Sequence, residues 1–328
     1  ERLGRKRGDP KLGDFLCQLL RENSRLHIYL LMWDFNVIYS AERELFQSLR
    51  LKLQGNSRLH VQLDGQHPLG ASQHQKLVVI DDSVAFCGGI DLSRWRWDTS
   101  AHKPDDPRRI DPDNKPYPPF HDLMLVVDGD AAAALGELAR TRWAASGSKL
   151  EPVQPEPVTE NRPWPESLEP LCTNHEIGIA RTYPGGDDRD AIREVEALYL
   201  KSIDAAKRWI YIENQYFTSK ELTRALSRSL RQKQGPEVVM VLPHHTGGWL
   251  EQATMDVLRG KLLSELQESD LHNRLRVLYP HQHGLGEQCI SVHAKLMIVD
   301  DGFLRAGSSN TSNRSMGLDS ECDLALEA

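Results

Sequence analysis

The residues best suited to chemistry form a His-x-Lys-x-x-x-x-Asp pattern that occurs twice in the chain. The two copies are His74, Lys76 and Asp81, and His293, Lys295 and Asp300. In an extended segment, residues i and i+2 point to the same side, so each histidine projects together with its lysine. Two copies that face each other would place two imidazoles and two ammonium groups in one cleft.

This set of side chains suits phosphoryl transfer. A neutral imidazole can attack phosphorus, while a protonated imidazole gives its proton to the leaving oxygen. The two ammonium groups neutralise the charge that develops on the phosphoryl oxygens, a task that other enzymes give to a metal ion. We therefore expect catalysis without a cofactor. The five cysteines are widely spaced and contain no Cys-x-x-Cys pair, so the sequence predicts neither a metal site nor a disulfide scaffold.

Each copy of the motif is followed by a run of small residues that begins seven positions after its aspartate. The runs contain Gly88, Gly89 and Asp91 in the first copy, and Ser308 and Asn310 in the second. Glycine lets the backbone approach a phosphate closely, and serine or asparagine can donate hydrogen bonds to its oxygens. We therefore assign these five residues to substrate binding.

The segments around the two motifs also resemble each other in order and spacing, which predicts a duplicated fold with two similar lobes. Pro-rich sequence between the halves reads as a linker. The predicted organisation is an N-terminal lobe at residues 1–146, a linker at 147–173 and a C-terminal lobe at 174–328. Apolar runs of strand length alternate with helical patterns, so we expect an α/β protein in which each lobe is a mixed β-sheet flanked by helices.

The elements that must position the motifs can be read from hydrophobic periodicity. The predicted helices are Leu12–Glu22, Ala131–Ala145, Ala191–Ala206, Ser219–Gln232 and Gly248–Ser269. The predicted strands are His27–Trp33, Leu59–Leu63, Leu77–Ile80, Val84–Cys87 and Leu123–Val127 in the first half, and Trp209–Ile212, Val238–Leu242, Leu275–Tyr279, Leu296–Val299, Phe303–Ala306 and Asp323–Leu326 in the second.

The repeat is uneven at one point. In the second half, the strand-helix unit Trp209–Gln232 precedes the strand at Val238–Leu242, whereas the matching place in the first half holds only the helix at Leu12–Glu22. We therefore expect that the opening strand of the first half is missing, and that the native protein is longer, with a membrane domain as one option for the additional sequence.

The double motif resembles the signature of the phospholipase D superfamily, and further segments are similar to its phospholipase branch. These segments cover most of the chain from about residue 27. They are Gly88-Gly89-Ile90-Asp91-Leu92, Arg96-Trp97-Asp98-Thr99, Pro119-Phe120-His121-Asp122, Ile212-Glu213-Asn214-Gln215, Arg314-Ser315-Met316 and Asp319-Ser320-Glu321. The resemblance adds Gln215 to the substrate-binding residues.

The resemblance implies roles for the motif residues. His74 would attack phosphorus, and His293 would act as acid and then as base. Asp122 would orient His74, and Glu321 would orient His293, with Asp323 as the other candidate. The motif aspartates Asp81 and Asp300 would hold the ends of strands through hydrogen bonds.

The function implied is that of a phospholipase D, which cleaves a phosphatidylcholine-like glycerophospholipid at a membrane surface to give phosphatidic acid and an alcohol. Either water or a primary alcohol would accept the phosphatidyl group. A cardiolipin-synthase-like transferase, a superfamily nuclease and a non-catalytic lipid-binding scaffold are the alternatives. The net charge of −7 argues against nucleic acid as a partner. No apolar run is long enough to span a membrane, and we expect a cytoplasmic or peripheral location at the cytoplasmic membrane face.

Overall fold

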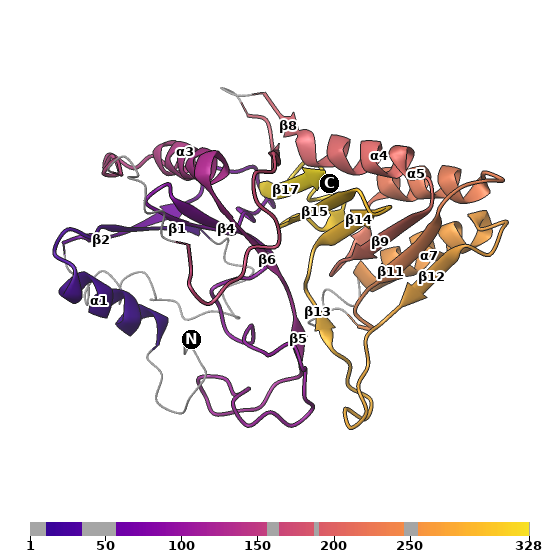
Figure 1. Ribbon diagram of the computed structural model, residues 1–328, viewed down its shortest axis with the longest axis horizontal. Coiled ribbons are helices and arrows are strands. Elements are labelled where there is room, and N and C mark those ends of the chain that lie inside the picture. Colours follow the sequence, from indigo (N-terminus) through magenta and orange to yellow (C-terminus); the bar gives the residue numbers. More distant parts are fainter. Residues whose placement is uncertain (1–10, 35–56, 156–163, 187–189, 246–254, 328) are drawn as a thin grey trace.

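The computed structural model describes residues 11–34, 57–155, 164–186, 190–245 and 255–327. It is a mixed α/β structure, which confirms the predicted fold class. Two groups of strands and helices lie side by side (Figure 1). We call the elements from α1 to α3 the N-terminal lobe and those from β7 to β17 the C-terminal lobe. Within the described residues no helix or strand lies between Ala145 and Ile177, where the linker is predicted.

The C-terminal lobe is built on one eight-stranded sheet. In spatial order its strands are β12 (Leu275–Leu278), β11 (Glu237–Val241), β9 (Trp209–Glu213), β14 (Leu296–Val299), β15 (Phe303–Gly307), β17 (Glu321–Glu327), β7 (Ile177–Tyr183) and β8 (Ile192–Arg193). The first three strands are parallel to one another, and the remaining neighbours pair in antiparallel fashion. Strand β9 lies between β11, to which it is parallel, and β14, to which it is antiparallel.

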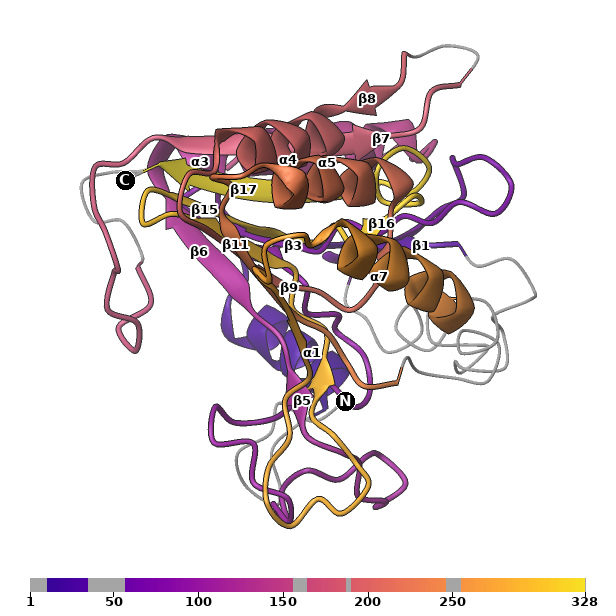
Figure 2. The ribbon, with the colours of Figure 1, turned by 90° about the vertical axis from the view of Figure 1, so that its right-hand side faces the viewer.

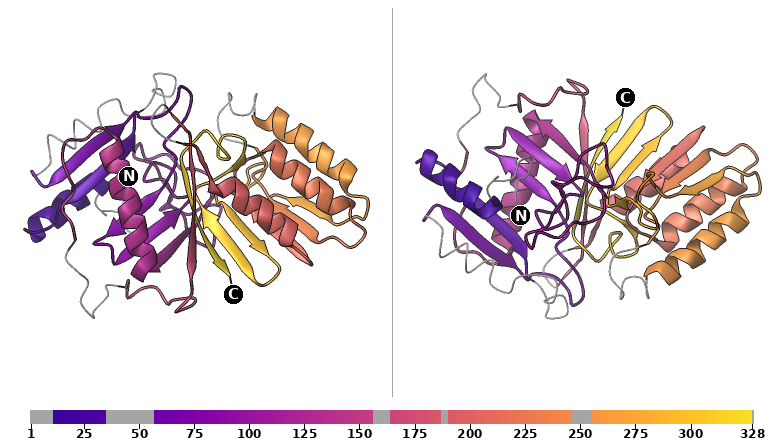
Figure 3. Two further views of the ribbon diagram at one scale, coloured as in Figure 1. Left: turned by 90° about the horizontal axis from the view of Figure 1, so that it is seen from above. Right: turned by 90° about the horizontal axis from the view of Figure 1, so that it is seen from below.

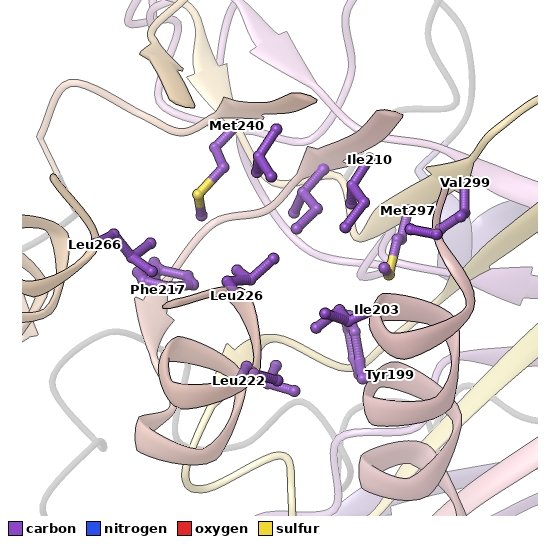
Figure 4. Close-up of a cluster of buried hydrophobic side chains, with 14 of the residues drawn as sticks. Tyr199, Ile203, Ile210, Phe217, Leu222, Leu226, Met240, Leu266, Met297 and Val299 are labelled. Carbon is purple, nitrogen blue, oxygen red and sulfur yellow. The ribbon is translucent and has the colours of Figure 1, made fainter. Parts of the chain in front are cut away.

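Three helices pack on this sheet and form the main core with it. They are α4 (Glu194–Ala205), α5 (Lys220–Arg231) and α7 (Val257–Ser269). Figure 2 shows α4 and α5 running side by side over the strands. Alternate residues of β9, Ile210 and Ile212, are buried against the helices, as expected for one face of a strand. Figure 4 shows apolar side chains from α4 and α5, such as Ile203 and Leu226, pointing toward those of the strands.

The N-terminal lobe contains the same kinds of elements, but its strands form two separate sheets. One sheet has the order β3 (Leu77–Ile80), β4 (Val84–Gly88) and β6 (Met124–Asp128), and the other pairs β1 (Ile28–Trp33) with β2 (Leu59–Asp64). Helix α1 (Leu12–Glu22) packs on the β1–β2 sheet, and α3 (Gly129–Ala145) packs on the other.

The repeat explains why the sheet of the N-terminal lobe is divided. Strands β1 and β2 correspond to β11 and β12, and β3 corresponds to β14. In the C-terminal lobe β9 joins β11 to β14, whereas no strand within the described residues joins β1 to β3.

Two short strands from different lobes pair directly and connect the two halves. Strand β5 (Phe120–His121) runs parallel to β13 (Ser291–Val292). Each of these strands lies at the end of a long loop, and both loops extend from the same side of the molecule (Figures 1 and 2). The views from above and below in Figure 3 show the two lobes side by side, with the strands of the C-terminus next to the N-terminal lobe.

Most predicted elements occur within a few residues of their expected bounds, and helix α1 has the bounds predicted. Strand β7 is missing from the prediction because its polar residues interrupt the apolar alternation. The remaining strands that the prediction lacks have only two residues each: β5, β8, β13, β10 (Phe217–Thr218) and β16 (Thr311–Ser312). The first part of the helix predicted at Gly248–Ser269 lies outside the described residues.

Candidate active site

The imidazole of His74 is held by a carboxylate from the other lobe. Its Nδ1 atom lies 2.9 Å and 3.0 Å from the two carboxylate oxygens of Glu321. The Glu321 side chain is completely buried, while that of His74 is 25% exposed. Burial opposes ionisation of Glu321, but the neighbouring His74 lowers the pKa of that carboxyl below its ordinary value. The ionised carboxylate therefore accepts a hydrogen bond from Nδ1–H of His74, and Nε2 of His74 takes no part in that hydrogen bond.

The second histidine is held in the same way, again by the opposite lobe. The Nδ1 atom of His293 lies 2.7 Å from a carboxylate oxygen of Asp122, and both side chains are almost fully buried. The predicted pairing, Asp122 with His74 and Glu321 with His293, is therefore wrong. Asp323, the alternative partner, is buried in an ion pair with Arg305.

The crossed pairing follows from how the backbones meet at the lobe boundary. The amide of His74 donates to the carbonyl oxygen of Ser320 at 3.1 Å, and that of His293 donates to the carbonyl oxygen of His121 at 2.7 Å. Each acceptor directly precedes the carboxylate residue of its own lobe. A histidine segment thus docks on the carboxylate segment of the other lobe, in two equivalent arrangements related by the repeat.

Each lysine of the motifs reaches back over its own histidine. Nζ of Lys76 donates to the carbonyl oxygen of His74 at 2.7 Å, and Nζ of Lys295 donates to that of His293. Lys295 also donates to the side-chain oxygen of Gln215 at 3.3 Å. The structure therefore places Gln215, a predicted substrate contact, against a lysine of the site.

Asp91 connects the two motifs within the cleft. Its carboxylate lies 3.2 Å from Nζ of Lys76, 3.1 Å from the Arg96 guanidinium and 4.0 Å from Nε2 of His293. Burial opposes its ionisation, but the cations Lys76 and Arg96, Lys76 foremost, hold the pKa of Asp91 well below its ordinary value. His74, Lys76, Asp91 and His293 thus belong to one electrostatic cluster, as a single shared site requires.

Burial strongly changes the protonation of the second motif. Burial, together with the nearby Lys295 ammonium, lowers the pKa of His293 to about 3, although Asp122 opposes the change. Burial also lowers the pKa of Lys295 to about 7, against the opposing effect of Asp122. At neutral pH, His293 is therefore a neutral imidazole, and Lys295 gives up its proton at a lower pH than an ordinary lysine does.

The glycines of the first small-residue run make room for protein atoms rather than for substrate. A Cβ atom on Gly88 would lie 2.4 Å from the carbonyl oxygen of Leu123, and one on Gly89 would lie 2.2 Å from the Asp122 carboxylate. This corrects their predicted role in substrate binding. The glycines let β6 and Asp122 come close enough to reach His293.

In the second small-residue run, Ser308 supports a carboxylate of the site, and Asn310 remains a candidate for contact with the substrate. Ser308 is completely buried, and its hydroxyl donates to Glu321 at 2.5 Å. Its predicted contact with phosphate is corrected: the hydroxyl orients the carboxylate that orients His74. Asn310 differs, because its buried side-chain oxygen accepts no hydrogen bond from the residues that the structure describes.

The two motif aspartates lie away from the cluster of histidines and lysines. The Asp300 carboxylate accepts hydrogen bonds from the backbone amides of Lys207, Arg208 and Trp209, where β9 begins. It holds the end of a strand, as predicted. Asp81 has no such strand to hold, and no hydrogen bond to its carboxylate occurs within the described residues.

Two histidines that the sequence analysis did not select also lie beside the site. Nε2 of His121 lies 2.7 Å from Glu213 of the C-terminal lobe, and Nδ1 of His121 lies 3.2 Å from Nε2 of His102. The position of His121 directly before Asp122 is the sequence signal that could have identified it. No group of three or more potential metal ligands occurs among the described residues.

Comparisons with known proteins agree with this fold. Residues 199–328 match the family model described as "Cardiolipin synthase, PLD-like domain". The chain is 27% identical to phospholipase D A of Dictyostelium discoideum over 79% of this chain and 24% of that protein. It is 24% identical to phospholipase D alpha 1 of Vigna unguiculata over 78% of this chain and 45% of that protein. The chain therefore spans a quarter to a half of the length of these relatives.

Among solved structures, phosphatidylserine synthase of Haemophilus influenzae has a TM-score of 0.60 to this chain at 12% identity. The match covers 96% of this chain and 72% of the synthase, and it shows a shared fold. Together with the paired motifs in one cluster, these comparisons support the phospholipase D superfamily for this chain. No helix among the described residues is both long and apolar enough to cross a bilayer.

Proposed function

We propose that this protein is a phospholipase D that cleaves glycerophospholipids through a covalent phosphohistidine. The observation that carries the proposal is the pair of imidazoles, His74 and His293, each fixed by a buried carboxylate on Nδ1 beside a lysine. A carboxylate on Nδ1 fixes the tautomer and stabilises the imidazolium that forms during proton transfer. The remaining nitrogen of each ring is available for phosphorus or for a proton.

The two half-reactions use the two imidazoles in turn. Nε2 of one histidine forms a bond to phosphorus as the phosphorus–oxygen bond to the head-group alcohol breaks, and the other histidine gives that oxygen its proton. The second histidine then takes a proton from water or from a primary alcohol, whose oxygen displaces the first histidine. When water is the acceptor, the product is phosphatidic acid. When an alcohol is the acceptor, the product is a new phosphatidyl ester.

The protonation and exposure of the two histidines support a choice of which one attacks. His293 is neutral and almost completely buried, as suits a nucleophile that must hold a lone pair toward phosphorus. His74 is more exposed, so that water and alcohols can reach it. We therefore propose that His293 attacks and His74 acts as acid and base. These roles are the reverse of those that the family resemblance implies.

The decisive experiment is incubation with phosphatidylcholine vesicles in the presence of ethanol, followed by lipid analysis. We expect phosphatidylethanol and phosphatidic acid from the protein, and neither product from His74→Asn or His293→Asn. These substitutions keep an amide N–H near each carboxylate while removing Nε2. Absence of both products with the unaltered protein would refute the proposed activity.

A phosphatidyltransferase of the cardiolipin-synthase type is the second candidate. It is favoured by the description of the family model that matches residues 199–328, and by the name of the structural neighbour, a phosphatidylserine synthase. The chemistry at the histidines would be identical, and only the acceptor alcohol would differ. Vesicles of phosphatidylglycerol, with and without ethanol, distinguish the two functions, because a transferase of this type would form cardiolipin in preference to phosphatidic acid.

A further inference from the structure

Beside the site, two histidines lie in line between two carboxylates. Nδ1 of His102 is 2.9 Å from Asp98, and Nε2 of His102 is 3.2 Å from Nδ1 of His121. Nε2 of His121 is in turn 2.7 Å from Glu213. Asp98, His102 and His121 belong to the N-terminal lobe and Glu213 to the C-terminal lobe, so this row of four side chains crosses the lobe boundary.

Both carboxylates at the ends of the row are ionised. Burial opposes the ionisation of Asp98, but hydrogen bonds from His102 and from the amides of Phe120 and Thr99 lower its pKa, with Arg109 assisting. Burial likewise opposes ionisation of Glu213, whose pKa is lowered by His121 and by the Tyr211 hydroxyl, which donates to it at 2.5 Å. An ionised carboxylate only accepts hydrogen bonds, so the ring nitrogen that faces each one carries a hydrogen.

The number of protons on the two rings follows from these hydrogen bonds. Nδ1 of His102 and Nε2 of His121 are occupied by the hydrogens that point to the carboxylates. Between the rings, one nitrogen must donate and the other must accept. Four ring nitrogens therefore carry three hydrogens, whereas two neutral imidazoles carry two and two imidazolium ions carry four.

We propose that His102 and His121 share one extra proton, and that the resulting cation is a positioning element that fixes the active-site segments across the lobe boundary. The backbone of His121 makes this connection. Its carbonyl oxygen accepts hydrogen bonds from the amides of His293 and Ala294, and the next residue, Asp122, holds the His293 ring. When Glu213 holds the His121 side chain, it also fixes two contacts that orient His293. These are the hydrogen bond from the His293 amide to the His121 carbonyl oxygen and the contact between the His293 ring and Asp122.

Loss or gain of a proton would break the row. With one proton fewer, two nitrogen lone pairs face each other at 3.2 Å, and with one more, two N–H groups do so. The charged groups around the pair favour the single cation. Glu213 raises the pKa of His121 against the effect of burial, and Asp122 adds to the increase. We therefore expect the alkaline loss of this proton to release His121 from its partner and to lower kcat.

The proton count is tested directly by nitrogen NMR of protein labelled at histidine, with no substrate present. We expect His102 and His121 to lose a single proton together, from three ring hydrogens to two, as pH rises. Signals of two neutral rings at pH 6 to 7, or of two independent titrations, would overturn the shared proton.

The positioning role is tested by Glu213→Gln, in which the amide oxygen still accepts from His121 but the charge is removed. We expect the midpoint of the shared deprotonation to fall by about one pH unit. The pH at which kcat decreases on the alkaline side should fall by the same amount, while KM changes little. Glu194→Gln, which removes a carboxylate that pairs with Arg181 in the same lobe, should move neither midpoint. A shifted NMR midpoint with an unchanged kcat profile would overturn the positioning role.

The kinetic readout rests on the proposed function, but the NMR readout does not. Hydrolysis of bis(p-nitrophenyl) phosphate supplies kcat for a simple phosphodiester if phosphatidylcholine proves to be the wrong lipid. Failure on the lipid with success on this ester would count against the proposed substrate alone. Failure of the predicted NMR titration would count against the shared proton alone.

Discussion

His74 of the N-terminal lobe is oriented by Glu321 of the C-terminal lobe, at 2.9 Å between Nδ1 and a carboxylate oxygen. Neither lobe therefore holds both a histidine of the site and the carboxylate that orients it. Glu321→Gln keeps the size of the side chain and removes the charge that stabilises the imidazolium of His74. We expect kcat to fall by about 10²- to 10⁴-fold, with the thermal unfolding midpoint nearly unchanged. Retention of full activity would show that the carboxylate has only a structural role. Glu327→Gln, at an exposed position, is the control.

The two histidines should be distinguishable with an activated substrate. A p-nitrophenyl phosphodiester needs little protonation of its leaving group, so the first half-reaction should survive loss of the acid. We expect His74→Asn to release one equivalent of p-nitrophenol in a burst, with the phosphoryl group trapped on His293. His293→Asn should give no burst. Phosphohistidine at position 74 would restore the roles that the family resemblance implies.

Lys295 should reduce stability while it supports catalysis. Its pKa in the folded protein, about 7, lies below its ordinary value of 10.5. The unfolded chain therefore binds this proton more tightly, and stability is lost as pH falls from about 10 toward 7. Lys295→Met removes this effect, so we expect a stability gain of about 1 kcal/mol or more at pH 7, together with loss of activity.

The dependence on pH identifies the source of that gain. The difference in stability between Lys295→Met and the unaltered protein should shrink as pH rises from 7 toward 10. Denaturant unfolding at several pH values measures it. A gain that does not vary with pH would point to packing rather than to the buried charge. Lys233→Met, at an exposed position, should show no such trend.

Ser308 provides a test of whether the small-residue run binds phosphate. Its hydroxyl donates to Glu321, so Ser308→Ala should act through the orientation of His74. We expect kcat to fall by about 10-fold or more, the value of one hydrogen bond to a charged group, with KM nearly constant. A raised KM with an unchanged kcat would instead support direct contact with the phosphate.

Removal of metal ions should leave the reaction intact. Lys76 and Lys295 lie beside the two histidines and supply the positive charge that a metal ion would otherwise provide. We expect full activity on short-chain soluble phosphatidylcholine after exhaustive EDTA treatment. Loss of activity that calcium or zinc restores would contradict this assignment of the charges.

The sequence predicted which side chains gather at the site better than it predicted how they are paired. The two His-x-Lys pairs and the strand-holding role of Asp300 follow from local spacing, because i and i+2 share a side and an aspartate after a strand can bind backbone amides. The partners of the histidines depend instead on contacts between segments about 170 to 250 residues apart, such as those of His293 with Asp122. No local pattern fixes how two similar lobes dock.

The roles of the small residues were misjudged for a related reason. Gly88, Gly89 and Ser308 have the composition of a phosphate-binding turn, and composition does not show on which side of the turn the substrate lies. The structure places Asp122 against Gly89 and Glu321 against Ser308. On the open side of the turn these residues would contact the substrate. On the packed side they contact the carboxylates that orient the two histidines.

The divided sheet of the N-terminal lobe has a consequence for local unfolding. Within the described residues, strands β1 and β2 pair with no strand other than each other, and with α1 they bury a small core of their own. A major polar connection to the rest of the lobe is Arg142, which binds Asp64 at the end of β2 and also Gln75. Such a unit can open without disturbing the large sheet. Backbone amides of β1 should therefore exchange with deuterium much sooner than those of β9, which has a strand on both sides.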